Sequence, residues 1–106
     1  MEYRVTFHPR AVRELHELAD YIVEHGSAAR AAVFVGRIRD YCLGFGTFPE
    51  RGTLREDLGP GVRLVGFRRR VSITFAVRGD FVHILGIFYG GRNIDLGTIE
   101  DEEVED

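Results

Sequence analysis

Two apolar stripes at helical spacing, separated by a very short link, constrain the fold of this chain more than any other feature. Apolar side chains that recur at steps of three and four residues form one buried face of a helix. Gly26 and Ser27, between the stripes, indicate a helix end followed by a helix start. Helices joined so closely pack as an antiparallel hairpin, so both stripes should face one core. The stripes consist of Ala11, Leu15, Leu18 and Ile22, flanked by Val12 and Ala19, and of Phe34, Ile38, Tyr41 and Phe45, flanked by Val35 and Cys42.

Strand signals lie on both sides of this helical region. Residues 3–7 alternate apolar and polar side chains with the period of two that marks a half-buried strand, and Pro9 suits the first turn of the following helix. The glycines, prolines and charges of residues 46–61 indicate an irregular connector. Three more strands are expected near residues 62–67, 71–78 and 81–89, with Gly79 and Asp80 as a two-residue hairpin turn. The sequence therefore predicts an α+β fold: an N-terminal strand, an antiparallel helix hairpin and a three-stranded antiparallel meander, with the helices packed on one sheet face.

The hairpin turn also predicts which side chains share a face of the sheet, because residues paired across strands point the same way. It pairs Val77 with Val82 and, at the far end, Val71 with Phe88. The predicted core face holds Val71, Ile73, Phe75, Val77, Val82, Ile84 and Phe88. The opposite face, which we call the open face, is predicted to hold Ser72, Thr74, Ala76, Arg78, Phe81, His83, Leu85, Ile87 and Tyr89. If the preceding hairpin turns at Arg68 and Arg69, then Arg63, Val65 and Phe67 join the open face.

The open face carries large apolar side chains that nothing in the chain is expected to cover. Two short helices can cover only one side of a sheet, whereas Phe81, Leu85 and Ile87 are predicted to point to the other side. Apolar patches of several hundred Å² are uncommon on the surface of a monomer. The pattern therefore predicts that another protein binds this face.

Length and charge narrow the class of protein. A chain of 106 residues has room for one domain, which we assign to residues 1–98. The last seven residues, EDEEVED, hold six acids, and we expect residues 99–106 to form a flexible tail that shields the basic body. The net charge of −3 is unlike that of a nucleic-acid-binding domain, so no direct nucleic-acid contact is expected. With neither a long apolar run nor the layout of a signal peptide, the chain is expected to be cytoplasmic and to bind no membrane.

The chemistry-bearing residues indicate neither a metal nor a cofactor. Cys42 is the one cysteine, which excludes internal disulfides, and we interpret it as a small core residue. His8, His16 and His25 lack the spacing of metal ligands, and no glycine-rich loop leads into a helix. Glu14 and Glu17 are expected to form a solvated flank of the first helix.

The order of the elements and several short motifs resemble the ParE branch of the RelE/ParE toxin superfamily from Tyr3 to about Asn93. The motifs are HPRAVRELHELADYI after the first strand, FPERG in the connector, GVRLVGF at the start of the meander and FYGGRN at its end. The resemblance implies a bacterial toxin held inactive by a ParD-like antitoxin, whose C-terminal segment wraps the toxin in a hetero-oligomer. It also implies one of two targets: ParE-like toxins poison DNA gyrase, whereas RelE-like relatives cleave mRNA on the ribosome.

The middle strand of the meander favours inhibition of DNA gyrase over cleavage of mRNA. RelE-like cleavage requires cations for the developing phosphate charge, and the resemblance implies an arginine on that strand with a tyrosine or histidine near the C-terminus. Aligned with these relatives, Ser72 stands about where that arginine is expected, and a serine cannot offset that charge. Arg68, Arg69 and Arg70, just before it, are the alternative source of positive charge. We therefore expect a non-enzymatic gyrase inhibitor, with a RelE-like endoribonuclease as the alternative and an inert, self-associating protein as a third class.

Eleven residues are the candidates for binding the antitoxin or the target, and none is assigned a catalytic role. Tyr89 and Arg92 are also open to a reading as remnants of a nuclease site, or as ordinary structural residues. His83 has a reference pKa near neutrality, but no carboxylate lies beside it in the predicted register. The candidates are Arg63, Phe67, Arg68, Arg70, Arg78, Phe81, His83, Leu85, Ile87, Tyr89 and Arg92.

Overall fold

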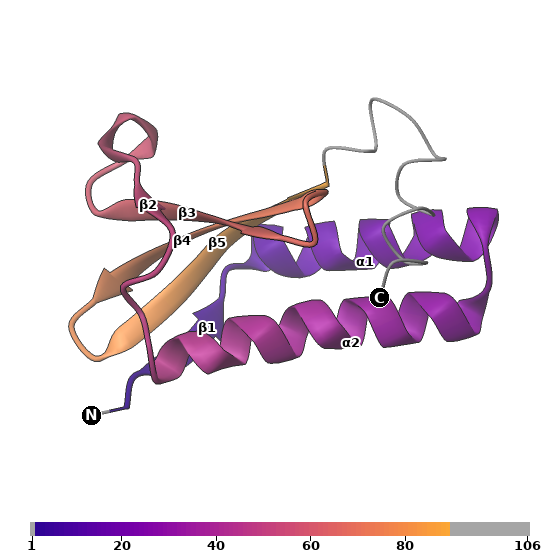
Figure 1. Ribbon diagram of the computed structural model, residues 1–106, viewed down its shortest axis with the longest axis horizontal. Helices are drawn as coiled ribbons and strands as arrows, with labels where there is room; N and C mark the ends of the chain where they lie inside the picture. The colour runs from indigo at the N-terminus through magenta and orange to yellow at the C-terminus, as the bar shows by residue number, and fades with distance from the viewer. Residues whose placement is uncertain (1, 90–106) are drawn as a thin grey trace.

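The computed structural model describes residues 2–89 and has two helices packed against one five-stranded sheet (Figure 1). The elements are β1 (Arg4–Phe7), α1 (Pro9–His25), α2 (Ala28–Leu43), the 3₁₀ turn η1 (Gly44–Gly46), β2 (Thr53–Leu54), the 3₁₀ turn η2 (Glu56–Leu58), β3 (Val62–Phe67), β4 (Val71–Arg78) and β5 (Phe81–Tyr89). The strand order is β1-β5-β4-β3-β2, with β1 parallel to β5 and all other pairs antiparallel. The predicted α+β fold is confirmed, and the short edge strand β2 is the one strand here that the sequence pattern missed.

Both helices begin at the predicted positions because local side chains cap them. The His8 ring nitrogen Nδ1 accepts a hydrogen bond from the Arg10 amide at 3.0 Å, and Pro9 occupies the first position of α1. Ser27 Oγ accepts from the Arg30 amide at 3.1 Å and starts α2 directly after α1 ends. Each cap supplies an acceptor to an amide that has no partner within the helix. The two helices therefore form the tight antiparallel hairpin seen in Figure 1.

One hydrophobic core lies between the helix hairpin and the sheet. Most of the predicted helix stripes are buried, whereas Tyr41 is half-buried and the flanking Val12 is exposed. Cys42, near the end of α2, has an exposed fraction of 0%. Burial raises the pKa of the Cys42 thiol to about 12, because the thiolate would lose its hydration. The buried core consists of Ala11, Leu15, Leu18, Ile22, Ala31, Phe34, Ile38, Cys42, Phe45, Val71, Ile73, Phe75, Val82, Ile84, Ile87 and Tyr89.

A bulge in β5 overturns the predicted faces of its last residues. The predicted pairs Val77 with Val82 and Phe75 with Ile84 are present, but the register then shifts, and Thr74 pairs with Gly86. Leu85 is the extra residue, and it moves every later side chain of β5 to the other face. The prediction that Val71 faces Phe88 is therefore wrong, since Val71 faces Tyr89. Ile87 and Tyr89 enter the core instead of the open face, and Phe88 leaves it.

The observed turn between β3 and β4 differs from the predicted one, and so does the pairing of these two strands. Phe67 pairs with Val71, so the turn contains three residues, Arg68 to Arg70, instead of the two that were expected. Arg68 and Arg69 both have a positive φ, 56° and 65°. The added residue reverses the faces of β3. The side chains at positions 63, 65 and 67 consequently lie on the helix-covered face, and the prediction that they join the open face is wrong.

Glu14 of α1 continues the edge of the sheet where β1 ends. β1 pairs with β5 only from Phe81 to Ile84, and the His8 amide then donates to the Ile84 carbonyl at 2.8 Å. Further along the same strand, the Ile87 amide donates to Glu14 Oε1 at 2.7 Å, while Oε2 of this carboxylate lies 3.2 Å from Arg10 Nε. The interpretation of Glu14 as part of a solvated flank is therefore wrong, because its carboxylate satisfies a backbone donor just past the bulge.

Within residues 2–89, no helix has the length and apolar character needed to cross a lipid bilayer.

Replacing Glu14 should destabilise the fold through the Ile87 amide. We expect E14A to lower the free energy of unfolding by about 2 kcal/mol, because it leaves a partly buried donor without its acceptor. E14Q keeps a side-chain carbonyl oxygen and should lose less. Urea denaturation monitored by circular dichroism measures both, with E24A on the exposed part of α1 as the control. Equal stability of E14A and E24A would contradict this role.

The Cys42 thiol should be unreactive while the protein is folded. A pKa of about 12 leaves almost no thiolate at pH 8, and burial blocks the approach of a reagent. We expect no reaction with a thiol reagent at pH 8 in buffer and complete reaction in denaturant, measured by mass spectrometry. Rapid modification of the native protein would show that the core around α2 opens readily.

Candidate partner-binding surface

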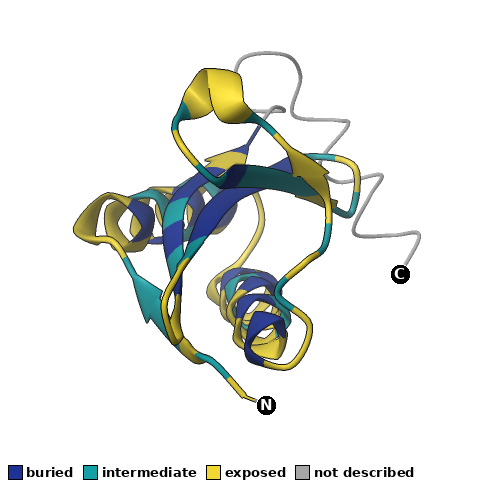
Figure 2. Cartoon of the chain, turned by 90° about the vertical axis from the view of Figure 1, so that its left-hand side faces the viewer, coloured by how far each residue is buried: buried dark blue, intermediate teal, exposed yellow. Residues whose placement is uncertain are grey.

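The open face of the observed sheet is the side that neither helix covers (Figure 2). Both helices contribute to the core on one side of the sheet, and Figure 2 shows the exposed η2 turn standing above the sheet. From here on, "open face" means the set that the observed register defines. These residues are Arg4, Thr6, Thr53, Val62, Leu64, Gly66, Ser72, Thr74, Ala76, Arg78, Phe81, His83, Gly86 and Phe88, together with Leu85 at the bulge.

Two partly exposed aromatic rings lie toward the two ends of this face. Phe81 and Phe88 have exposed fractions of 37% and 38%, and their positions in β5 place them about 23 Å apart along the strand. The His83 ring stacks on Phe81 with centroids 5.7 Å apart, and its Nδ1 lies 2.6 Å from Thr6 Oγ1. The recorded hydrogen-bond partner of His83 is thus a hydroxyl and not a carboxylate.

Phe88 is held in place at the far end of the face. A side chain at Gly86 would come within 3.0 Å of the Phe88 ring, so the ring lies across this glycine. The Arg10 guanidinium packs on the ring, 5.1 Å from its centroid. Cation and glycine together fix an aromatic ring that still presents more than a third of its surface to solvent.

The floor of the open face between these rings is neutral and made of short side chains. Ala76 and Thr74 have exposed fractions of 1% and 8%, and Ser72 is half-buried. Arg78, at the end of β4, turns to the connector, where its Nη2 donates to the Pro60 carbonyl at 2.9 Å. The middle of the face therefore consists of short, uncharged side chains, of which Ala76 and Thr74 are almost fully buried.

The motif FPERG, which carries part of the family resemblance, has a structural role. The Arg51 guanidinium lies 4.6 Å from the Phe45 ring centroid and 5.6 Å from that of Tyr41, and its Nε donates to the Phe48 carbonyl at 2.8 Å. Gly52 has a φ of 72°, and a side chain there would lie 2.2 Å from the Leu64 carbonyl oxygen. Arginine and glycine together bring the connector against both the end of α2 and β3.

Arg63 belongs to the same connection. Its Nε donates to the Arg51 carbonyl at 2.9 Å, and its side chain is half-buried on the helix-covered face. This contact explains why an arginine follows the GV dipeptide at the start of β3. A role of Arg63 in binding a partner stays a prediction, and it would have to act from this face.

The other candidates separate into three groups. Phe67 packs against the Phe34 and Tyr41 rings of α2, with centroids 6.2 and 4.9 Å away. Arg68 and Arg70 lie in the β3–β4 turn, with the Arg68 guanidinium 5.1 Å from the Phe67 ring centroid. In the core, Ile87 has an exposed fraction of 2%, and Tyr89, at 5%, meets Tyr21 of α1 edge to face. Arg92 lies outside the described residues.

Of the candidates, Phe81, His83 and Leu85 lie together on the open face, and Arg78, which pairs with Phe81, lies at the end of this face as predicted. Phe88, which the sequence pattern assigned to the core, joins them.

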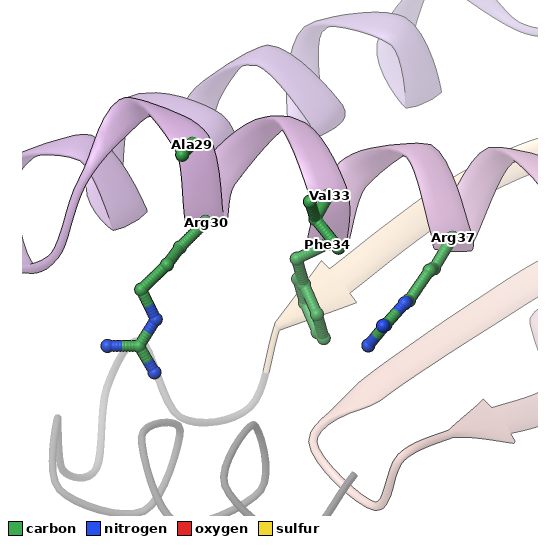
Figure 3. A pocket seen from close by; sticks show the side chains of 5 residues that line it. All are labelled: Ala29, Arg30, Val33, Phe34 and Arg37. Atoms are coloured by element: carbon green, nitrogen blue, oxygen red, sulfur yellow. The ribbon is translucent and has the colours of Figure 1, made fainter.

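A groove along α2 was missed by the sequence analysis. It has a volume of about 270 Å³ and is lined by Ala29, Arg30, Val33, Phe34 and Arg37. Figure 3 shows Arg30, Phe34 and Arg37 projecting from the same side of the helix. The available signal was Val33, an apolar residue outside the predicted stripe, which has an exposed fraction of 52%. Within residues 2–89, no cluster of three potential metal ligands accompanies this groove or the open face.

Comparisons with known proteins agree with this fold. A family model described as the ParE toxin of the type II toxin–antitoxin system parDE matches residues 5–94. The structure is similar to the chromosomal ParDE toxin–antitoxin system from P. aeruginosa, with 24% identity, a TM-score of 0.73 and coverage of 83% of this chain and 96% of that one. It is also similar to the toxin–antitoxin complex RelBE2 from Mycobacterium tuberculosis, with 20% identity, a TM-score of 0.62 and coverage of 84% and 92%. No curated protein matches the sequence.

Replacing Arg51 should loosen the connector. We expect R51A to lower the free energy of unfolding by about 2 kcal/mol, since it removes hydrogen bonds to carbonyls and packing on two rings. R55A is the matched control, because Arg55 lies in the same connector and bonds only Asp57 through its side chain in the recorded contacts. Thermal unfolding of both variants makes the comparison, and equal melting temperatures would refute the role of Arg51.

Proposed function

This chain belongs to the family of ParE toxins of type II toxin–antitoxin systems, and we propose that it acts by binding and inhibiting DNA gyrase and that a ParD-like antitoxin neutralises it. A gyrase target also implies that the protein works in the cytoplasm.

The chemistry of the open face is the observation that carries this proposal. Its middle strand contributes Ser72, Thr74 and Ala76, which are neutral, short and largely buried, and partly exposed aromatic rings lie at both ends of β5. Partly exposed aromatic side chains beside small uncharged ones are typical of the centre of protein–protein interfaces. A face of this kind supports inhibition by binding better than it supports chemistry on RNA.

The alternative, a RelE-like endoribonuclease, has less support. That reaction needs positive charge over the middle of the face and an acid for the leaving oxygen. Ser72 supplies no charge, and Tyr89, the candidate acid, is buried on the helix-covered face against Tyr21. The tyrosine and the open face therefore lie on opposite sides of the sheet.

We propose that the antitoxin uses two features of the fold. An amphipathic helix of the antitoxin lies against the helix hairpin, and an extended segment adds to an edge of the sheet. The edges are β1 and β2, of which β1 presents the longer strand, Arg4–Phe7. Acidic side chains of the antitoxin would meet Arg78 or the arginines of the β3–β4 turn.

Expression of the chain without its antitoxin tests the proposed target. We expect growth arrest with loss of DNA supercoiling and intact mRNA in the same cells. Cleavage of mRNA within codons while supercoiling persists would refute the gyrase proposal and restore the nuclease alternative. Dimers of the free protein without growth arrest would indicate the inert, self-associating class instead.

Substitutions on the open face test which surface binds the target. F81E and F88E place a charge at partly exposed positions, so we expect folded proteins whose inhibition of gyrase supercoiling is at least about 10-fold weaker, typical for the loss of an interface anchor. F48E is the matched control, because Phe48 is also an exposed phenylalanine, with a fraction of 68%, but lies in the connector. If F48E weakens inhibition as much as F81E and F88E do, the open face is not the specific site.

A further inference from the structure

The groove along α2 combines an apolar floor with positive charge. Phe34 and Val33 form the floor, and Arg30 and Arg37 stand about two helical turns apart on either side of it (Figure 3). Phe34 also meets Phe67, the residue directly before the arginine turn of residues 68–70. The groove thus lies close to the largest local concentration of arginine in the chain.

The charge of the chain is divided sharply between two segments. All fourteen basic residues are arginines and precede residue 93, whereas six of the seventeen acids lie within residues 100–106. Residues 1–99 therefore carry a formal charge of +3 and residues 100–106 a charge of −6. The arginine fork binds carboxylates in pairs of parallel hydrogen bonds, which makes an acidic segment a well-matched ligand.

The acidic segment can reach the groove. Tyr89 pairs with Val71, and Val71 pairs with Phe67, so two strand spacings of about 4.8 Å separate the end of β5 from β3. Phe67 in turn contacts the floor of the groove. The ten residues from 90 to 99 span up to about 33 Å when extended, which exceeds the distance to be covered.

We propose that residues 99–106 bind in the α2 groove of the same chain, with their carboxylates on Arg30, Arg37 and the β3–β4 turn and with Ile99 or Val104 on the apolar floor. The acidic tail is then a tethered peptide ligand for this surface, present at high effective concentration because it is part of the chain. This inference concerns the tail and α2 only, and it does not depend on the proposed gyrase target.

A spin label on the tail of the full-length chain tests the proposal. D106C carries a nitroxide at the end of the tail, while buried Cys42 stays unlabelled. We expect the label to broaden the amide NMR signals of residues 29–37 and 68–70 and to leave those of β2 sharp. Raising the salt from about 0.1 M to 1 M shortens the Debye length from about 10 Å to 3 Å and should remove most of the broadening.

Charge-reversal variants separate specific docking from general attraction. R30E/R37E should lose the broadening, whereas R39E, the same charge change on the same helix but outside the groove lining, should keep it. Combining R30E/R37E with lysine at the remaining tail acids should restore the line broadening. Such a rescue would show that R30E/R37E did not lose the broadening through misfolding. No broadening on α2 in the parent chain, or equal loss in R39E, would overturn the proposal.

A mixture of isotope-labelled and spin-labelled chains identifies the occupant. Broadening of the isotope-labelled chains in this mixture would mean that the tail of a second copy fills the groove, which contradicts binding within one chain. Broadening that occurs only when both labels are on the same molecule supports it.

Discussion

The bulge at Leu85, together with the carboxylate of Glu14, determines which side chains at the end of β5 enter the core and how α1 meets the edge of the sheet. Because one extra residue reverses the side-chain faces of a strand, the bulge sends Ile87 and Tyr89 into the core and Phe88 out of it. Glu14 then binds the Ile87 amide, just beyond the point where β1 stops pairing with β5. One irregularity therefore places a tyrosine under α1, an aromatic ring on the open face and a helix along the strand edge.

A second constraint joins the connector to the rest of the fold. Arg51 stacks on the aromatic rings at the end of α2, and Arg63 donates a hydrogen bond to the Arg51 carbonyl. The backbone at Gly52 lies so close to β3 that no side chain would fit between them. The motifs that carry the family resemblance in this region thus describe how the fold is held together. They give information about architecture, and function has to be argued from the open face and from the groove on α2.

The open face and the α2 groove differ in chemistry, so they are suited to different kinds of ligand. The open face is neutral at its centre and aromatic at its ends, a combination suited to packing against another protein. The α2 groove is apolar with arginines beside it, a combination suited to an acidic peptide. A chain with a positive body and a strongly negative end therefore holds a ligand for the second surface within its own sequence.

The sequence alone determined the elements and most of the core. Helical periodicity identified Ala11, Leu15, Leu18 and Ile22 as buried, and alternation gave the bounds of the three meander strands, because both patterns are local. Register is not local: the three-residue turn at Arg68 to Arg70 and the bulge at Leu85 each shift pairing by one position. No local sequence pattern indicates either shift. Only the pairing of the strands in three dimensions therefore decided which face of the sheet holds Arg63, Phe67, Ile87, Phe88 and Tyr89.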